Sequence, residues 1–204
     1  MDTEIKIADK PARERILLTA HDLFYRDGIR ATGIDKVIAE SAVSKVTFYR
    51  HFPSKNALVL AFLAYRHRRW MDWFGDALQR HGAKPGAGLQ PLVATLEEWF
   101  KHPVFRGCAF INITAEMGDA IPDVLTVCRD HKQDMLEIIA DLLPESEDRM
   151  VLANAVAVAV DGAIVKAQLE PIDSQAKVTL QSLAVILEAL DKCARDSANK
   201  LTPY

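Results

Sequence analysis

The sequence has few of the residues that cross-link small secreted proteins or bind metals through sulfur. Its 204 residues include three cysteines, Cys108, Cys128 and Cys193. Their number is odd and they form no Cys-x-x-Cys pair, so neither a disulfide framework nor a metal site is indicated. We expect three buried thiols in a reducing compartment. A redox role of Cys108 is the alternative.

A long apolar run is also missing. The most apolar stretch, residues 153–160, is far shorter than the about 20 residues that span a bilayer, and Asp161 follows it directly. The opening residues, MDTEIKIADK, are charged and lack the apolar segment of a secretory signal. We therefore expect a cytoplasmic protein with no membrane partner.

Glycine and proline are scarce, at nine each, which excludes a collagen-like or low-complexity chain. Hydrophobic residues make up 50% of the sequence and charged residues 26%. The usage of Ala, Leu, Glu and Lys favours helices. The composition is therefore that of an ordinary globular protein, and we predict the all-α fold class.

The charges are distributed unevenly along the chain. Residues 1–70 contain 13 Lys and Arg against 8 Asp and Glu, a balance of +5. Residues 71–204 contain 12 against 20, a balance of −8, which gives the net charge of −3. A basic first third on an acidic remainder is typical of a module that faces nucleic acid.

Apolar periodicity predicts short helices in this basic third. Residues 11–27 place Ile16, Ala20 and Leu23 on one helical face, and Gly28 stands where a glycine would end the helix.

The next two helices are predicted from their caps. Thr32, with Asp35 three residues later, predicts the start of a second helix that ends near Ser41. Ser44 is the predicted N-cap of a third helix, Lys45–His51.

The third helix must close before Pro53, because the residue before a proline disfavours the α conformation. Its core-facing side chains are either Val46 and Tyr49 or Phe48 and Phe52. Two short helices joined by a tight turn, both resting on a preceding amphipathic helix, form a helix-turn-helix.

Ser54 is the predicted cap of a long helix that reaches about Arg80. A loop over residues 81–91 and three further segments follow, namely a helix near 89–101, a segment at 107–118 and a helix at about 121–142.

The last third predicts self-association. Residues 148–170 are apolar on most faces, and Leu180, Leu183 and Leu187 recur at helical spacings of three and four. Two such helices from each of two subunits would complete a four-helix bundle, so we predict a symmetric homodimer.

The residues at 13–62 resemble the N-terminal DNA-binding domain of tetracycline-repressor-like (TetR) transcriptional regulators. The most specific part is TFYRHFPSKNAL, where Tyr49, Phe52, Lys55 and Leu58 have the order and spacing of that family. The segment RGCAFINITAEMGD is similar to one found in a branch of the family.

Two residues depart from the family pattern. Ala42 stands where the family often has glycine in the turn, and Val46 stands where a glycine or small residue is common. Alanine is compatible with this turn if Ala42 stays outside the left-handed region.

The resemblance implies a dimeric, ligand-responsive repressor without enzymatic activity or cofactor. It would bind a palindromic operator in double-stranded DNA and would be released by a small-molecule inducer. We predict three parts of the chain, a disordered tail at residues 1–10, a helix-turn-helix DNA-binding domain at 11–54 and a ligand-binding and dimerisation domain at 55–204.

The predicted DNA-binding residues lie on the third helix and at neighbouring helix starts. Lys45 and Thr47, with Arg50 as a further candidate, are placed to contact base edges. Tyr49 and His51 are assigned to backbone oxygens by the resemblance. The full predicted set is Thr32, Ser44, Lys45, Thr47, Tyr49, Arg50, His51 and Lys55.

Aromatic and polar residues of the middle third are candidates for an inducer pocket, because ligand cavities combine apolar walls with a few polar anchors. These candidates are Trp70, Trp73, Phe74, Trp99, Phe110, Asn112, Thr114, Glu116 and Met117. Two other readings stay open, a helical protein-binding adaptor that has lost DNA binding and a small helical enzyme. For Asp161, inside an apolar helix, we expect a partner across the dimer or within the bundle.

Overall fold

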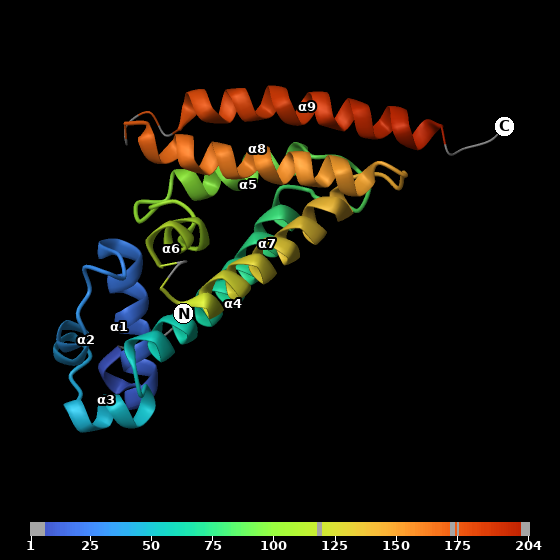
Figure 1. The fold of residues 1–204 in the computed structure, drawn as a ribbon. Helices are drawn as coiled ribbons and strands as arrows, with labels where there is room; N and C mark the ends of the chain where they lie inside the picture. The colour runs from blue at the N-terminus through green and yellow to red at the C-terminus, as the bar shows by residue number, and fades with distance from the viewer. Residues whose placement is uncertain (1–6, 118–119, 172–173, 175, 201–204) are drawn as a thin grey trace. The chain divides into compact units, whose positions relative to one another are not determined.

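The computed structural model describes residues 7–117, 120–171, 174 and 176–200. Across these residues the chain forms a short 3-10 helix and nine α-helices, without a strand, which confirms the all-α class (Figure 1). The elements are η1 (Ile7–Asp9), α1 (Ala12–Asp27), α2 (Ile34–Glu40), α3 (Lys45–His51), α4 (Lys55–Arg80), α5 (Gln90–Phe100), α6 (Ala109–Met117), α7 (Pro122–Leu142), α8 (Arg149–Leu169) and α9 (Lys177–Asn199).

The chain divides into two compact units. The first contains the described residues up to Arg68 together with Ala109–Cys128. The second contains Arg69–Cys108 and the described residues from Arg129 onward. These limits differ from the functional domains predicted from sequence, which stay a prediction. Residues 1–6 of the expected tail and Gly118 of the expected segment at 107–118 lie outside the described residues.

In the first unit α1 packs against both α2 and α3. Its apolar face buries Ile16, Ala20 and Leu23, as the periodicity predicted. The helix ends at Gly28, which adopts a φ of 85° and donates its N–H to the carbonyl of Phe24. A left-handed residue at this point favours glycine, so the predicted helix end is confirmed.

The predicted cap of the second helix was wrong. The N-cap of α2 is Gly33, and no side chain caps this helix. Thr32 is only 1% exposed, and its hydroxyl turns back to donate to the carbonyl of Gly28. The preference for Thr at N-caps was outweighed here by a local hydrogen bond across the preceding turn.

The third helix agrees with its prediction at both ends. The hydroxyl of Ser44 accepts the N–H of Thr47 at 3.1 Å, which confirms the N-cap. Phe48 and Phe52 are the core-facing pair, at 0% and 2% exposure, and Val46 and Tyr49 face outward. The choice between the two pairs that the sequence left open is therefore decided.

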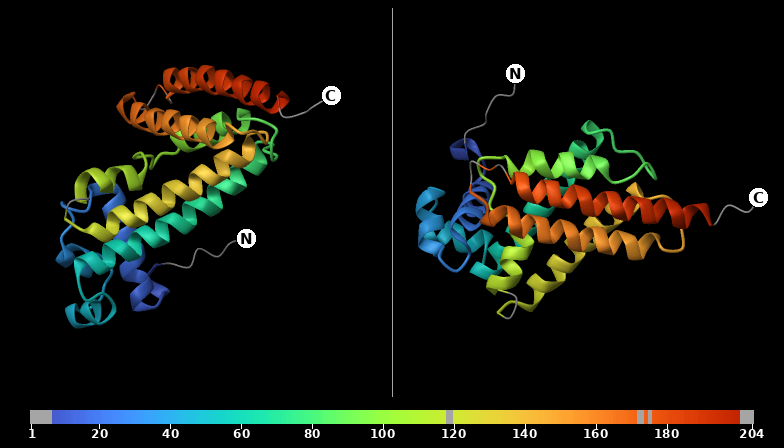
Figure 2. Two further views of the ribbon diagram at one scale, coloured as in Figure 1. Left: turned by 45° about the vertical axis from the view of Figure 1, so that its right-hand side comes forward. Right: turned by 90° about the horizontal axis from the view of Figure 1, so that it is seen from above.

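In the second unit α8 and α9 lie side by side, and α5 packs against α9 (Figures 1 and 2). The leucine stripe of α9 points into this layer, with Leu180, Leu183 and Leu187 buried. The expectation that the chain lacks a long apolar stretch was wrong for α8, whose 21 residues are enough to cross a membrane by length and composition alone. Core helices of soluble proteins share this property.

A buried carboxylate joins α9 to the start of α5. Asp191 is 3% exposed, and its two oxygens accept the N–H of Leu89 at 3.1 Å. Leu89 is the N-cap residue of α5, so Asp191 supplies the acceptor that the cap side chain lacks. A Cβ on Gly88 would come within 2.8 Å of the Asp191 carboxylate, which explains glycine at this position.

The expectation of three buried thiols holds for two of them. Cys108 and Cys128 are buried, whereas Cys193 is exposed.

In the turn between α2 and α3, Ala42 does not meet the condition under which alanine suits this position. Ala42 is in the left-handed region with a φ of 52°, and its N–H donates to the carbonyl of Ala39. A Cβ in this region clashes with the neighbouring carbonyl, at a cost of about 1–2 kcal/mol. The helix-turn-helix therefore contains strain at its turn.

Replacing Ala42 by glycine should relieve this strain. We expect Ala42→Gly to raise the free energy of unfolding by about 0.5–1 kcal/mol, the steric gain less the entropy added to the unfolded chain. Equilibrium unfolding in guanidinium chloride measures the change. The matched control is Ala39→Gly, an exposed position within α2, which should instead destabilise by about 1 kcal/mol. A loss of stability in Ala42→Gly would contradict the strain.

Candidate functional site

The outward side of α3 forms a surface of cationic, hydroxyl and aromatic side chains. Lys45 is exposed, and its ammonium lies 3.9 Å from the carboxylate of Asp35, a distance at which an exposed pair is weak. Arg50 is exposed and has no partner among the residues that the structure describes. Tyr49 is exposed too, and its ring stands edge-on to buried Phe48.

Val46 lies beside Lys45 with 75% of its surface exposed. An apolar side chain this open gains nothing from the core, and it adds an apolar contact to the α3 surface. Thr47 is half-buried, and its hydroxyl lies 2.9 Å from that of Ser44, so the N-cap also orients the threonine.

Within the described ranges of the chain, only some of the basic side chains near this surface lack an intramolecular ion pair and are available to bind a ligand. Lys36 and Arg26 both hold the carboxylate of Asp27, at 2.9 Å and 2.7 Å. Hydrogen bonds from Arg26 and then from Lys36 keep the pKa of Asp27 well below its usual range. These two cations are therefore engaged within the unit, whereas Arg50 is not.

Lys55, at the start of α4, is half-buried and contacts the turn after α1. Its ammonium donates to the carbonyl of Ile29 at 2.5 Å. Burial lowers the pKa of Lys55, and the nearby carboxylate of Glu116 acts in the opposite direction. The side chain thus ties α4 to this turn.

Glu116, on α6, closes the same turn from the other side. One carboxylate oxygen accepts the N–H of Ile29 at 3.2 Å, and the other accepts the N–H of Arg30. A Cβ on Gly28 would stand 3.4 Å from this carboxylate. Glu116 and Lys55 therefore satisfy the donors and the acceptor of one backbone turn, within the first unit.

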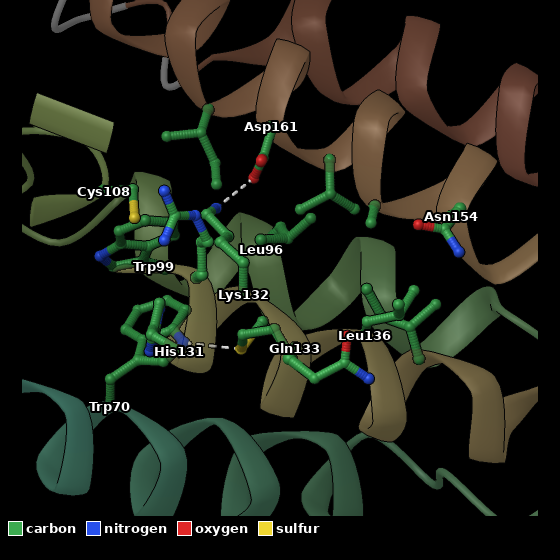
Figure 3. Close-up of a pocket in the computed structure, with 16 residues that line it drawn as sticks. Trp70, Leu96, Trp99, Cys108, His131, Lys132, Gln133, Leu136, Asn154 and Asp161 are labelled. Atoms are coloured by element: carbon green, nitrogen blue, oxygen red, sulfur yellow. Dashed lines mark hydrogen bonds and ion pairs between the residues drawn. The ribbon is translucent and has the colours of Figure 1, made fainter. Parts of the chain in front are cut away.

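The second unit contains a cavity of about 400 Å³ that is bounded by side chains of α4, α5, α7 and α8 (Figure 3). Trp70 and Trp99 form an aromatic wall, with ring centroids 4.3 Å apart. The indole N–H of Trp70 donates to the sulfur of Met135 at 3.0 Å. Leu96 and Leu136 add to the apolar lining.

The same cavity has charged groups at its rim. Lys132 of α7 donates to Asp161 of α8 at 2.5 Å, so Asp161 finds its partner within the bundle (Figure 3). Arg129 also lines the cavity, and it has no partner within the described part of the chain. No group of three or more His, Cys, Asp or Glu residues that could hold a metal ion occurs in that part of the chain.

Only two of the predicted pocket residues, Trp70 and Trp99, line this cavity. Trp73 and Phe74 belong to the same unit and contact the Trp70 ring, but they are not part of the lining. The other five candidates belong to the first unit, namely Phe110, Asn112, Thr114, Glu116 and Met117.

Sequence reasoning missed the contribution of α7. Lys132, Arg129 and Met135 lie among other polar and apolar residues of an ordinary amphipathic helix, and nothing in their spacing marks a cavity. For the charged rim, Asp161 was the one signal in the sequence, as an acid in an apolar helix.

Comparison with known proteins agrees with the helix-turn-helix geometry. Residues 16–62 match the family described as bacterial regulatory proteins, tetR family. The chain is 30% identical over 140 residues to the HTH-type transcriptional regulator UidR of Escherichia coli (strain K12). The matched region covers 69% of this chain and 68% of UidR. It is 22% identical over 148 residues to the HTH-type transcriptional repressor NemR of the same organism. This second matched region covers 72% of this chain and 74% of NemR.

Among solved structures, SCO4454, a TetR-family transcriptional regulator from Streptomyces coelicolor, is similar with a TM-score of 0.76 and 30% identity. The match covers 88% of this chain and 96% of SCO4454. The chain belongs to the tetR family of bacterial regulatory proteins. It is thus a DNA-binding transcriptional regulator and not an enzyme.

The contact of Glu116 with the turn after α1 can be tested by removing its charge. Glu116→Gln keeps one acceptor for the N–H groups of Ile29 and Arg30 and loses the other, so we expect a destabilisation of about 1 kcal/mol. The pKa of Lys55 should fall further, because the carboxylate that opposes the effect of burial is gone.

Chemical unfolding measures the first effect, and an NMR titration of the Lys55 side chain measures the second. Glu40→Gln, at an exposed position of α2, is the control and should leave both values unchanged. A rise in the pKa of Lys55 in Glu116→Gln would show that the two groups do not interact as described.

Proposed function

We propose that this protein is a homodimeric repressor that binds a palindromic operator through α3 and leaves it when a small molecule enters the cavity of the second unit. The observation that carries the proposal is the division of α3 into two faces. Phe48 and Phe52 are buried, whereas Lys45, Val46, Tyr49 and Arg50 are exposed and Thr47 is half-buried.

The buried face allows such a short helix to exist. Seven residues are too few for an isolated helix in water, so its stability comes from packing on α1. The guanidinium of Arg13, on α1, lies 5.3 Å above the ring of Phe52 and adds to this contact. A helix held in this way enters a major groove as a rigid element.

The exposed face then assigns the contacts. Lys45 and Arg50 are suited to the acceptors of guanine, and the Thr47 hydroxyl is suited to either a base edge or a phosphate. Tyr49 and His51, near the end of the helix, are assigned to backbone oxygens, which fix the register on the duplex.

Three other predicted DNA contacts have partners within the protein. The hydroxyl of Thr32 is bound to Gly28, that of Ser44 to Thr47, and the ammonium of Lys55 to Ile29. We propose that these residues chiefly hold the reading helix and its turn in place. A phosphate contact by any of them would require an exchange of partner.

Self-association is supported by a stripe of exposed small and apolar residues on α8. Its spacing alternates between four and three residues, which is the repeat of helices that pack side by side. The stripe consists of Val151, Ala155, Val158, Gly162, Val165 and Leu169. Val158 has 74% of its surface exposed, and α9 has a shorter stripe of the same spacing through Val178, Ser182, Val185 and Ala189.

We infer that α8 and α9 pair with their counterparts in a second copy and form a four-helix bundle. In a two-fold dimer that binds one face of a duplex, the two α3 helices read half-sites about 34–36 Å apart, which makes the operator palindromic. The protein then acts in the cytoplasm, where its DNA lies.

Ligand control follows from population shift. The dimer would have one conformation that bridges both half-sites and one that does not. A molecule that binds the cavity more tightly in the second conformation lowers the affinity for DNA. The reduction cannot exceed the difference between its affinities for the two conformations. α4 has residues in both units, from Lys55 to Arg80, and is the continuous element that would carry the change.

The assignment of α3 is tested by selecting operator sequences from random duplexes and then comparing variants on them. Lys45→Ala should lose about 1–3 kcal/mol of discrimination at one base position in each half-site, with affinity for random DNA changed far less. For the unchanged protein, the logarithm of the DNA association constant should fall with the logarithm of the salt concentration, with a slope of about 0.9 per phosphate neutralised. Lys84→Ala, in the exposed loop before α5, is the control cation. If Lys45→Ala ranks operator variants as the unchanged protein does, the assignment of base reading is wrong.

The dimer interface is tested by placing a charge in the α8 stripe. Val158→Asp buries one carboxylate from each subunit in the interface, so we expect a monomer in analytical ultracentrifugation and a loss of operator affinity of at least tenfold. Gln79→Asp, at an exposed position of α4, should remain dimeric. A Val158→Asp protein that stays dimeric with full helix content would place the interface elsewhere.

A further inference from the structure

The proposed function states that a small molecule enters the cavity of the second unit, and the following inference about its chemistry rests on that proposal. We propose that the ligand is a flat aromatic monocarboxylate, with its ring system against Trp70 and Trp99 and its carboxylate on Arg129.

The charge balance of the lining favours an anion. Asp161 is the single acidic residue of the lining, and it is already bound to Lys132. These two charges cancel, which leaves the guanidinium of Arg129 without a partner in the described residues. A cationic ligand would have to displace Lys132 from Asp161, whereas an anion meets a cation that is available.

The number and type of this cation point to one carboxylate. A guanidinium presents its N–H groups as a planar fork that matches the two oxygens of a carboxylate. One available cation balances one negative charge. A phosphate dianion or a dicarboxylate would carry a second charge with no remaining cation, unless it broke the pair of Lys132 with Asp161.

The two tryptophan rings of the lining favour a flat ligand. The rings of Trp70 and Trp99 lie at 58° to each other with centroids 4.3 Å apart, and the ring of Phe74, which is not part of the lining, stacks on Trp70 at 17°. Because the Trp70 N–H is bound to Met135, this ring offers its apolar surface and not a donor. Aromatic ligands gain from edge and face contacts with such rings beyond the area that they bury.

The cavity limits the size of the ligand. A volume of about 400 Å³ lies at the lower end of the range of about 300–1,000 Å³ for ligand sites, so a ring system of one or two rings fits better than a large drug.

Three probes with the same naphthalene ring separate the effect of charge from that of the ring, namely 2-naphthoate, its isosteric neutral analogue 2-naphthamide and cationic 2-naphthylmethylammonium. Isothermal titration calorimetry on the full-length protein should show 2-naphthoate binding at least tenfold more tightly than 2-naphthamide, with the cation weakest. Equal or tighter binding of the amide or the cation overturns the proposal. So does the absence of binding by all three probes at millimolar concentration.

The role of Arg129 is tested by Arg129→Gln, a change at an exposed side chain that should leave folding intact. We expect the affinity for 2-naphthoate to fall to within about threefold of that for 2-naphthamide, and the affinity for 2-naphthamide to stay unchanged. Lys192→Gln removes an exposed cation of α9 that does not line the cavity, and it should keep the full preference. An undiminished preference in Arg129→Gln assigns the anion to another group and overturns the proposal.

A DNA titration with and without 2-naphthoate separates this inference from the proposed function. Selective binding of 2-naphthoate together with a lowered operator affinity supports both. Selective binding without any effect on DNA supports the ligand class and counts against ligand-controlled release. If the operator is bound with an affinity that 2-naphthoate does not change, and the protein does not prefer the carboxylate probe, the proposed ligand class is wrong. The proposed DNA recognition is then unaffected.

Discussion

Burial of Phe48 and Phe52 against α1 is the interaction on which the DNA-binding surface depends. A helix of seven residues has no stability of its own in water, so its orientation is set by the side chains it buries. Once these two rings are fixed, helical geometry places Arg50 opposite the buried face and Lys45 and Thr47 at its two flanks. Recognition of DNA is in this sense a consequence of aromatic packing.

The turn after α1 shows how the same unit distributes its polar contacts. The backbone N–H groups of Ile29 and Arg30 have no partner in a helix, and Glu116 of α6 accepts both. The carbonyl of Ile29 accepts from Lys55 of α4. Helices far apart in the sequence therefore meet at one turn because its backbone groups must be satisfied. A residue that looks like a surface cation from its sequence context serves there as a structural donor.

Much of the fold was predictable because it rests on local rules. The third helix agreed with its prediction at both ends, since a serine cap and a following proline act within a few residues. The errors arose where local rules compete. Thr32 has the composition of an N-cap but bonds to Gly28, and Ala42 is left-handed although it is not glycine. In both cases the turn geometry required by packing outweighed a local preference of about 0.5–2 kcal/mol.

The sequence by itself determined the helical class, the bounds of α3 and the family to which the chain belongs, because each is carried by residues close together along the chain. Which pair of α3 side chains faces the core was decided by the tertiary structure. Only the tertiary structure decided which residues form the cavity. Trp70, Trp99, Lys132 and Asp161 come from four different helices, and no periodicity along one helix specifies its neighbours. It also decided that Arg129 is left without a partner, because pairing of charges depends on distances in space that the chain order does not contain.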